Sequence, residues 1–422
     1  MAKRIEVKLR NEIKDPRAEG LAAMLKKEFN AQITSLAVMD AYSLDADFDE
    51  KELEFLGAEV FSDKVIQEYS YKTPFHAGRW RVEIGYRPGV TDNVGKTAQD
   101  AVFDALGKHV AVYSSTVYAM GGELEMENCE AFGKRLANEL VQQIIVREPG
   151  TDAFEPYVPK VVLKQEINVE EIRLPKDDAQ LAQLSKKRLL ALSVPEMKSI
   201  REHFAKKSVA AERKKTGLGD DPTDVELEVI AQTWSEHCKH KIFNAEISYS
   251  ENGDSYNIDS LFKTFIRGAT EEIKKPYVVS AFKDNGGIIK FDPKNDIAIK
   301  VETHNAPSAL DPYGGALTGI LGVNRDIIGC GMGAYPIANI DVLCFGPLDD
   351  KGVDGVLPPR RIYEGVVEGI KDGGNKSGIP TVNGSFVFET CFSARPVIYC
   401  GTAGLLPTEI GGRKTAEKKV EP

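Results

Sequence analysis

The chain has 422 residues, which is long enough for two or three domains with sizeable cores. Its composition, with 42% hydrophobic, 28% charged and 8% aromatic residues, excludes a disordered, collagen-like or coiled-coil protein as a whole. The formal net charge of -10 argues against a nucleic-acid-binding protein. No apolar run reaches the roughly 18 residues that a membrane helix needs, and the charged start lacks the apolar core of a secretory signal. We therefore expect a cytoplasmic protein without nucleic-acid or membrane partners.

The first 150 residues contain an internal repeat. The segment Arg4–Val7 recurs as Arg81–Ile84, and each copy predicts a strand, a turn, an amphipathic helix, a second strand and a further helix. An apolar strand at 141–146 closes the second copy. We expect residues 1–150 to form one duplicated small α/β sandwich domain, with a sheet face buried against its helices.

The rest of the chain divides by composition into three parts. Residues 151–222 are punctuated by prolines and predict a linker of short helices. Its basic stretch at 201–218 predicts a solvated helix face, with a phosphate or partner contact as the alternative. Residues 223–407 predict an α/β domain with long glycine-containing loops, and residues 408–422 are polar and charged. The fold class expected for the whole chain is α+β.

Two of the six histidines fall in one dense polar cluster, from Trp234 to Phe243. A zinc site at His237, Cys238 and His240 is one interpretation, but the usual paired spacing of ligands is absent. Ordinary core or surface histidines are a second interpretation. The crowding of titratable groups at the end of an amphipathic helix favours a functional site. The six cysteines contain no CxxC pair, so neither a zinc ribbon nor a disulfide framework is predicted.

A second cluster follows the strand at 297–301. Alternation places Lys300, Glu302 and His304 on one face, where burial would cost free energy unless each had a partner. This trio is typical of a nucleotide site, in which the lysine holds phosphate, the carboxylate holds magnesium and the histidine moves a proton. A third cluster, at 311–326, predicts a glycine-rich turn and a helix ending in Arg325 and Asp326. It matches neither phosphate-loop fingerprint, so alone it favours a tight structural turn.

Together these motifs resemble one known family, the formylglycinamide ribonucleotide amidotransferases, or phosphoribosylformylglycinamidine synthases, of purine biosynthesis. The motifs that carry the resemblance are Ser235–Cys238, Lys300–Pro312, Tyr313–Gly315, Asn324–Asp326 and Ile379–Gly384. Residues 1–150 are similar to the family's small partner subunit and residues 151–222 to its linker. Residues 223–407 resemble the amino-terminal domain of an aminoimidazole ribonucleotide synthetase, and residues 408–422 the start of the domain after it.

The resemblance implies an ATP-dependent ligase and a role for each matching residue. ATP and Mg²⁺ would be the cofactors, and formylglycinamide ribonucleotide would become the amidine with ammonia from glutamine. The implied roles are an active-site position for His237, proton acceptance for His304, ATP contacts for His240 and Lys300, magnesium binding for Glu302 and Asp326, and substrate contacts for Thr303, Asn305, Ala306 and Arg325.

The chain departs from the family pattern in two ways. Ala306 stands where the family usually has a second histidine, which puts one substrate contact in doubt. The family's second synthetase domain and its glutaminase are not visible in this sequence, so we expect the chain to carry only part of the enzyme. Its expected partners are a glutaminase subunit or domain and either the carboxy-terminal half of the synthetase or a second copy. The alternatives are a catalytically silent assembly module and a related synthetase, for aminoimidazole ribonucleotide or selenophosphate.

Overall fold

The computed structural model describes residues 1–29, 32–76, 79–151, 154–161 and 168–418. Parts of the expected linker (152–153, 162–167) and of the last segment (419–422) lie outside the described residues. Helices and strands are both well represented, in agreement with the expected α+β class. Within the described ranges, no helix is both long and apolar enough to span a bilayer.

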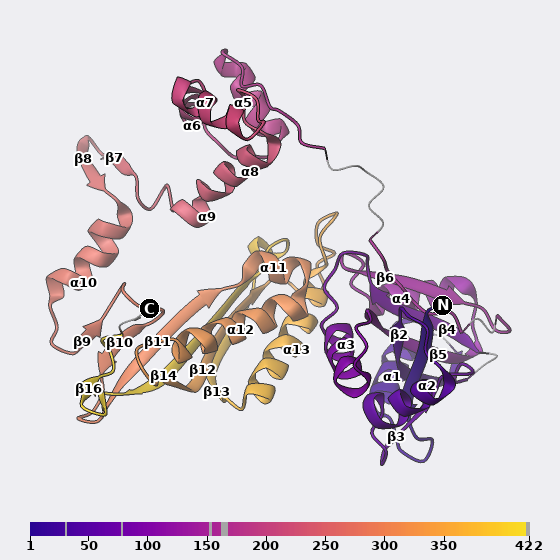
Figure 1. Ribbon diagram of the computed structural model, residues 1–422. Coiled ribbons are helices and arrows are strands. Elements are labelled where there is room, and N and C mark those ends of the chain that lie inside the picture. Colours follow the sequence, from indigo (N-terminus) through magenta and orange to yellow (C-terminus); the bar gives the residue numbers. More distant parts are fainter. Residues whose placement is uncertain (30–31, 77–78, 152–153, 162–167, 419–422) are drawn as a thin grey trace.

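The amino-terminal repeat folds into one six-stranded antiparallel sheet with helices on one face (Figure 1). The strand order β3-β1-β2-β5-β4-β6 places the two copies about a central β2–β5 pair. The elements are β1 (Lys3–Leu9), α1 (Pro16–Phe29), β2 (Gln32–Leu44), α2 (Glu50–Phe55), η1 (Leu56–Phe61), β3 (Gln67–Ser70), β4 (Trp80–Tyr86), α3 (Asn93–Leu106), β5 (Val112–Glu123), α4 (Met126–Leu136) and β6 (Gln142–Arg147). Alternation along β1 and β4 sends apolar side chains to the helices.

The other face of this sheet carries a buried ion network. The Arg4 guanidinium lies 2.8 Å from Glu83 and 3.1 Å from Glu6, and Arg147 donates to Glu83 at 2.6 Å. Burial opposes ionisation of Glu83, but Arg4, Ser115 and Arg147 outweigh it and lower the pKa of this carboxyl. The two copies are therefore joined by charge on one face and by apolar packing on the other.

The middle of the chain forms a small helical unit. Its elements are α5 (Asp178–Lys187), α6 (Val194–Phe204), α7 (Lys207–Lys215), α8 (Asp224–Thr233) and α9 (Glu236–Lys239). We expected a boundary at residue 222, yet α8 packs Leu227 and Ala231 into the same core as α5 and α6. The apolar face of α8 is thus buried in the linker unit, which places α8 with the linker and not with the sheet domain.

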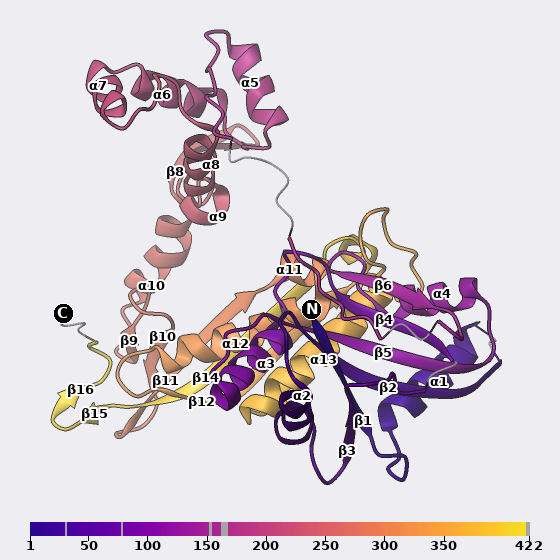
Figure 2. The same cartoon turned by 45° about the vertical axis from the view of Figure 1, so that its right-hand side comes forward.

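The last part contains the second six-stranded sheet, in the order β13-β12-β14-β11-β10-β9. It is preceded by β7 (Glu246–Glu251), β8 (Asp254–Asp259), η2 (Phe262–Arg267) and α10 (Gly268–Ile273). It comprises β9 (Val278–Ser280), β10 (Gly287–Lys290), β11 (Asn295–Thr303), α11 (Asn305–Leu310), α12 (Pro312–Ile328), β12 (Tyr335–Phe345), α13 (Pro359–Ser377), β13 (Thr381–Phe388), η3 (Thr390–Phe392) and β14 (Val397–Pro407), followed by β15 (Glu409–Ile410) and β16 (Arg413–Lys414). Both long helices, α12 and α13, lie on the same side of this sheet (Figures 1 and 2).

Side-chain contacts join the repeat domain to the second sheet domain. The Arg361 guanidinium, on α13, donates to the carbonyls of Arg135 and Ala137 at the end of α4, the latter at 3.0 Å. A cation here complements the negative end of that helix. Arg135 also pairs with Glu28 at 2.7 Å and with Glu364 at 3.3 Å. The amino-terminal domain is therefore docked against α13.

Candidate functional site

The candidate site lies on the helix-covered face of the second sheet, where β11 runs beside β14. Register pairs Lys300 with Thr402 and Glu302 with Cys400. Residues paired in an antiparallel ladder share a face, and Thr402 and Cys400 both face the helices. Lys300 and Glu302 therefore lie on the same face, as alternation predicted, and this face is the one under α12.

Lys300 and Asp326 meet directly. The Lys300 Nζ lies 3.0 Å from Asp326 Oδ2, with 28% and 19% of the two side chains exposed. The contact joins β11 to the last turns of α12, which the sequence places 26 residues further along the chain. Glu302 lies two positions beyond Lys300 and is exposed. Lys300 and Asp326 are thus in contact, and Glu302 lies two positions further along the same face of β11.

His304 stands where β11 gives way to α11. Its backbone N–H donates to the Ile398 carbonyl at 2.8 Å, and its carbonyl accepts from Ser308 Oγ at 2.6 Å. Its Nδ1 is buried without a hydrogen-bond partner among the described residues. Asn305 Oδ1 accepts from the Ile398 N–H at 2.9 Å, so this side chain holds the strand end. The backbone of His304 is held by these bonds, and its buried ring Nδ1 has no hydrogen-bond partner in the part of the chain that the structure describes.

The glycines at 311–326 lie within the expected helix, but the expected tight turn is wrong. A Cβ on Gly315 would lie 2.5 Å from the Ser308 backbone nitrogen, and a Cβ on Gly319 would lie 3.2 Å from Cys400 Sγ and from the His304 Cβ. These glycines let α12 approach α11 and β14 closely. They position the site through packing, since they lie inside a helix from Pro312 to Ile328.

Sequence reasoning missed a row of buried polar residues behind Lys300 and Glu302. Asn324 Oδ1 accepts from Asn339 Nδ2 and from Thr402 Oγ1, each at 2.8 Å. Asp341 pairs with Cys400 in the next row, and burial raises its pKa to about 6. The signal available in the sequence was Asp341, a carboxylate inside an apolar strand. Its neighbour Cys400 comes from β14, some 60 residues later, so the sequence alone does not place the two together.

His237 and His240 lie elsewhere, on and after the short helix α9. Ser235 caps this helix by accepting from the Cys238 N–H at 3.3 Å, and His240 ends it in the left-handed region with φ of 52°. Both histidines are exposed. No hydrogen bond among the described residues links them to β11 or α12, and α9 lies apart from the sheet in Figures 1 and 2. The structure does not bring these two histidines to Lys300.

The remaining predicted residues lie around the end of β11 and on α12. Thr303 is the last residue of β11, Ala306 lies in the first turn of α11, and Arg325 is exposed beside Asp326. The described residues hold no cluster of three or more His, Cys, Asp or Glu side chains arranged for a metal. Magnesium commonly takes one or two carboxylates and completes its shell with phosphate oxygens and water, and Glu302 and Asp326 are carboxylates of the kind that such an ion takes.

Two protein families match this arrangement of domains. The family described as AIR synthase related protein, N-terminal domain, matches residues 283–406. The formylglycinamide ribonucleotide amidotransferase linker domain matches residues 181–241, which include α8. Residues 283–406 are therefore similar to the AIR-synthase-related domain, and residues 181–241 to the amidotransferase linker domain.

Curated proteins that are similar to about half of the chain share one name. The phosphoribosylformylglycinamidine synthase subunit PurL of Thermoplasma acidophilum is 38% identical over 230 residues, covering 54% of this chain and 26% of that protein. The PurL of Salinibacter ruber is 34% identical over 200 residues, covering 47% of this chain and 23% of that protein. This chain is thus similar to PurL over about half its length, and it spans about a quarter of the length of the relatives it matches.

Solved PurL structures are also similar to part of the chain. T. maritima PurL complexed with ADP is 29% identical, covering 47% of this chain and 26% of that chain, with a TM-score of 0.31. T. maritima PurL complexed with FGAR is 31% identical, covering 47% of this chain and 25% of that chain, with a TM-score of 0.30.

Proposed function

We propose that this chain provides the ATP-binding part of a phosphoribosylformylglycinamidine synthase. The reaction would convert formylglycinamide ribonucleotide to its amidine, with ATP and with ammonia from glutamine, in cytoplasmic purine biosynthesis. The identity to PurL over about half the chain supports this proposal. The observation that carries it is the meeting of Lys300 with Asp326 on the face that also holds Glu302, with His304 at the end of the same strand.

The proposed roles follow from the chemistry of each side chain. ATP would supply the phosphoryl group that activates the amide oxygen. Lys300 would neutralise charge on the phosphates, and Glu302 and Asp326 would hold Mg²⁺. His304 would accept a proton from the attacking nitrogen. The further roles that we propose are an ATP contact for His240, an active-site position for His237, and substrate contacts for Thr303, Asn305, Ala306 and Arg325.

The proposed partners follow from what this half of the site leaves open. T. maritima PurL has been solved as part of a PurLQS assembly. We propose that this chain likewise works with a glutaminase, which delivers ammonia. We also propose that the helix-free face of the second sheet pairs with a matching sheet, from a second copy or from the other half of the synthetase. Ile299 and Val301 on this face are each 47% exposed.

Magnesium-dependent nucleotide binding tests the proposed site. Calorimetric titration of the chain with ATP should show tighter binding with Mg²⁺ than with EDTA. Glu302→Ala should weaken binding in Mg²⁺ by about tenfold or more, because a metal ligand is lost. The matched control is Glu389→Ala, an exposed carboxylate of the same domain that should leave binding unchanged. Equal magnesium dependence in the chain and in Glu302→Ala would contradict the assignment of Glu302.

A catalytically silent assembly module is the second candidate. The separation of His237 and His240 from β11 favours it, because the predicted ATP contacts are not assembled in one place. This candidate predicts no ATP binding by the chain with or without Mg²⁺. The same titration therefore separates the two functions.

A further inference from the structure

The first copy of the amino-terminal repeat contains a cavity of about 340 Å³, at the small end of the range for small-molecule sites. The cavity exists because β2 extends past β1. Register pairs β1 with residues 40–44 of β2, so residues 33–38 pair with β5 on one edge and lie open on the other. An open strand edge presents N–H and C=O groups to whatever occupies the space beside it.

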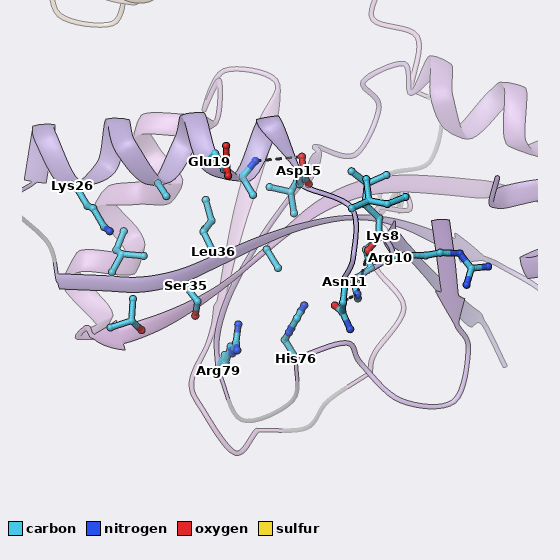
Figure 3. Close-up of a pocket in the computed structure, with 18 residues that line it drawn as sticks. Lys8, Arg10, Asn11, Asp15, Glu19, Lys26, Ser35, Leu36, His76 and Arg79 are labelled. Atoms are coloured by element: carbon cyan, nitrogen blue, oxygen red, sulfur yellow. Dashed lines mark hydrogen bonds between the residues drawn. The ribbon is translucent and has the colours of Figure 1, made fainter. Parts of the chain in front are cut away.

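Basic side chains outnumber acidic ones on the walls of this cavity. Helix α1 lies on one side of β2 with Lys26, and His76 and Arg79 lie on the other side (Figure 3). Among the described residues, no carboxylate forms an ion pair with Lys26 or Arg79. The full set of basic groups is Lys8, Arg10, Lys26, His76 and Arg79.

Both carboxylates of the cavity are engaged by other groups. Glu19 pairs with Lys14 at 2.8 Å. Asp15 accepts from the Arg17 backbone N–H at 2.9 Å, at the start of α1. Arg10 donates to the Lys64 carbonyl at 3.0 Å, and its guanidinium points away from His76 and Arg79 (Figure 3). Lys8 pairs with Glu68 of β3. The positive charge that no carboxylate pairs with among the described residues is therefore that of Lys26 and Arg79, with Arg10 turned away.

The pKa of His76 depends on the charges around the cavity. Burial lowers the pKa of its imidazole, and Arg79, Lys8 and Arg81 lower it further. Glu68 acts in the opposite direction, from β3. An anion placed beside Arg79 would offset the surrounding positive charge and raise the pKa of His76. The imidazole is thus a built-in reporter of anion binding.

In the second copy of the repeat, hydrogen bonds tie the helix to the strand at the corresponding place. Asp92, the counterpart of Asp15, accepts from Ser114 Oγ at 2.8 Å and from the Ser114 N–H at 2.6 Å, which ties α3 to β5. In the first copy, Ala37 and Val38 stand in the stretch that corresponds to Ser114, and among the described residues no hydrogen bond of this kind joins Asp15 to β2. The two copies therefore differ at this place in how the start of the helix is tied to the strand.

We propose that this cavity is a binding site for a phosphate group, carried by inorganic phosphate or by a small phosphomonoester. Arg79 provides a planar fork of donors that matches phosphate oxygens, and His76 lies beside it. Lys26 lines the same cavity from the other side of β2, so the site rests on Arg79 and His76. The site lies in the repeat domain, so it is independent of the nucleotide site proposed on β11.

Histidine NMR of the full chain tests this site without interference from the second sheet. The ring signals of ¹³C-labelled histidine would be followed during titrations with inorganic phosphate, with ribose 5-phosphate and with succinate, at constant ionic strength. His76→Gln assigns the His76 signal. Both phosphate compounds should shift this signal saturably and raise the pKa of His76. The compound that saturates it at the lower concentration identifies the source of the phosphate group.

Two variants with equal charge make the test specific. Arg79→Ala should weaken the response by about tenfold or more, because a charge-assisted bidentate contact is lost. Lys27→Ala removes one charge from α1 outside the cavity and should leave the response unchanged. The proposal is overturned if sodium chloride or succinate shifts His76 as phosphate does, or if neither phosphate compound shifts it. The titration of the unmodified chain decides between these outcomes even if Arg79→Ala does not fold.

Discussion

Lys300 and Asp326 are the residues that the nucleotide proposal needs most. Their ion pair keeps an ammonium and a carboxylate 3.0 Å apart, and both side chains remain partly exposed. A bound magnesium ion and phosphate group would supply one charge of each sign. Lys300 could then exchange Asp326 for the phosphate, and Asp326 could exchange Lys300 for the magnesium ion. Lys300 and Asp326 would therefore each keep a partner of opposite charge when a nucleotide binds.

Asp341 is a buried carboxyl close to this pair, and it makes stability depend on pH. Its pKa is raised to about 6, so the folded chain holds the proton more tightly than the unfolded chain does. Stability should fall as pH rises from about 4 to about 6, and then stay level. Asp341→Asn removes this penalty and should raise the free energy of unfolding at pH 7.5 by about 1–2 kcal/mol. At pH 4 the gain should disappear.

Urea unfolding of both proteins at these two pH values measures the difference. A variant that is less stable at pH 7.5 would show that the ionised carboxylate stabilises the fold. The buried Oδ1 of Asp341 has no hydrogen-bond partner among the described residues, which is why we expect the opposite.

At the scale of elements, α12 is held close to α11 and β14 by its glycines. Gly315→Ala should lower the free energy of unfolding by about 1–3 kcal/mol, because the added Cβ would lie 2.5 Å from the backbone nitrogen of Ser308. Gly322 is the matched control in the same helix, with open space where its Cβ would be. Gly322→Ala should raise stability by about 0.4–1 kcal/mol.

Thermal or urea unfolding of the two variants checks this account of α12. Equal effects of Gly315→Ala and Gly322→Ala would show that helix propensity, and not close packing, governs both positions. The contrast between them isolates the packing role that we assign to the glycines.

The sequence predicts the elements well because they depend on local patterns. Alternation along β11 placed Lys300 and Glu302 on one face, which the register confirms. The same reasoning could not find Thr402 and Asn339, since these residues reach Lys300 only through the order of strands in the sheet. The tight turn expected in the glycine-rich segment was wrong because glycine signals both turns and close helix contacts. The position of α8 depends on tertiary packing, which composition does not reveal.

At the scale of the whole molecule, the second sheet has one covered face and one open face. Register places Val301, Gly401 and Ile340 in one row on the open face. Val301 is 47% exposed and Ile340 39%. An exposed apolar row of this kind favours packing against another sheet, and Gly401 adds no side chain that would obstruct it.

We expect the chain to self-associate through this row at micromolar concentration. Val301→Asp should weaken association by about tenfold or more, because it puts a charge into the apolar contact. Val353→Asp is the control, at an exposed valine in the loop between β12 and α13. Sedimentation velocity measures both. A chain that remains monomeric at high concentration, or that associates equally well as Val301→Asp, would contradict this use of the face.

The most direct measurement of the central claim is ADP release by the chain with ATP, Mg²⁺, formylglycinamide ribonucleotide and a high concentration of ammonium, which replaces any glutaminase. The assay is run on the chain alone and with the remaining part of a PurL relative. The account predicts release that depends on formylglycinamide ribonucleotide and is lost in His304→Ala, which should still bind ATP because it removes a proton acceptor. Absence of substrate-dependent release in both assays, or full release by His304→Ala, would contradict it.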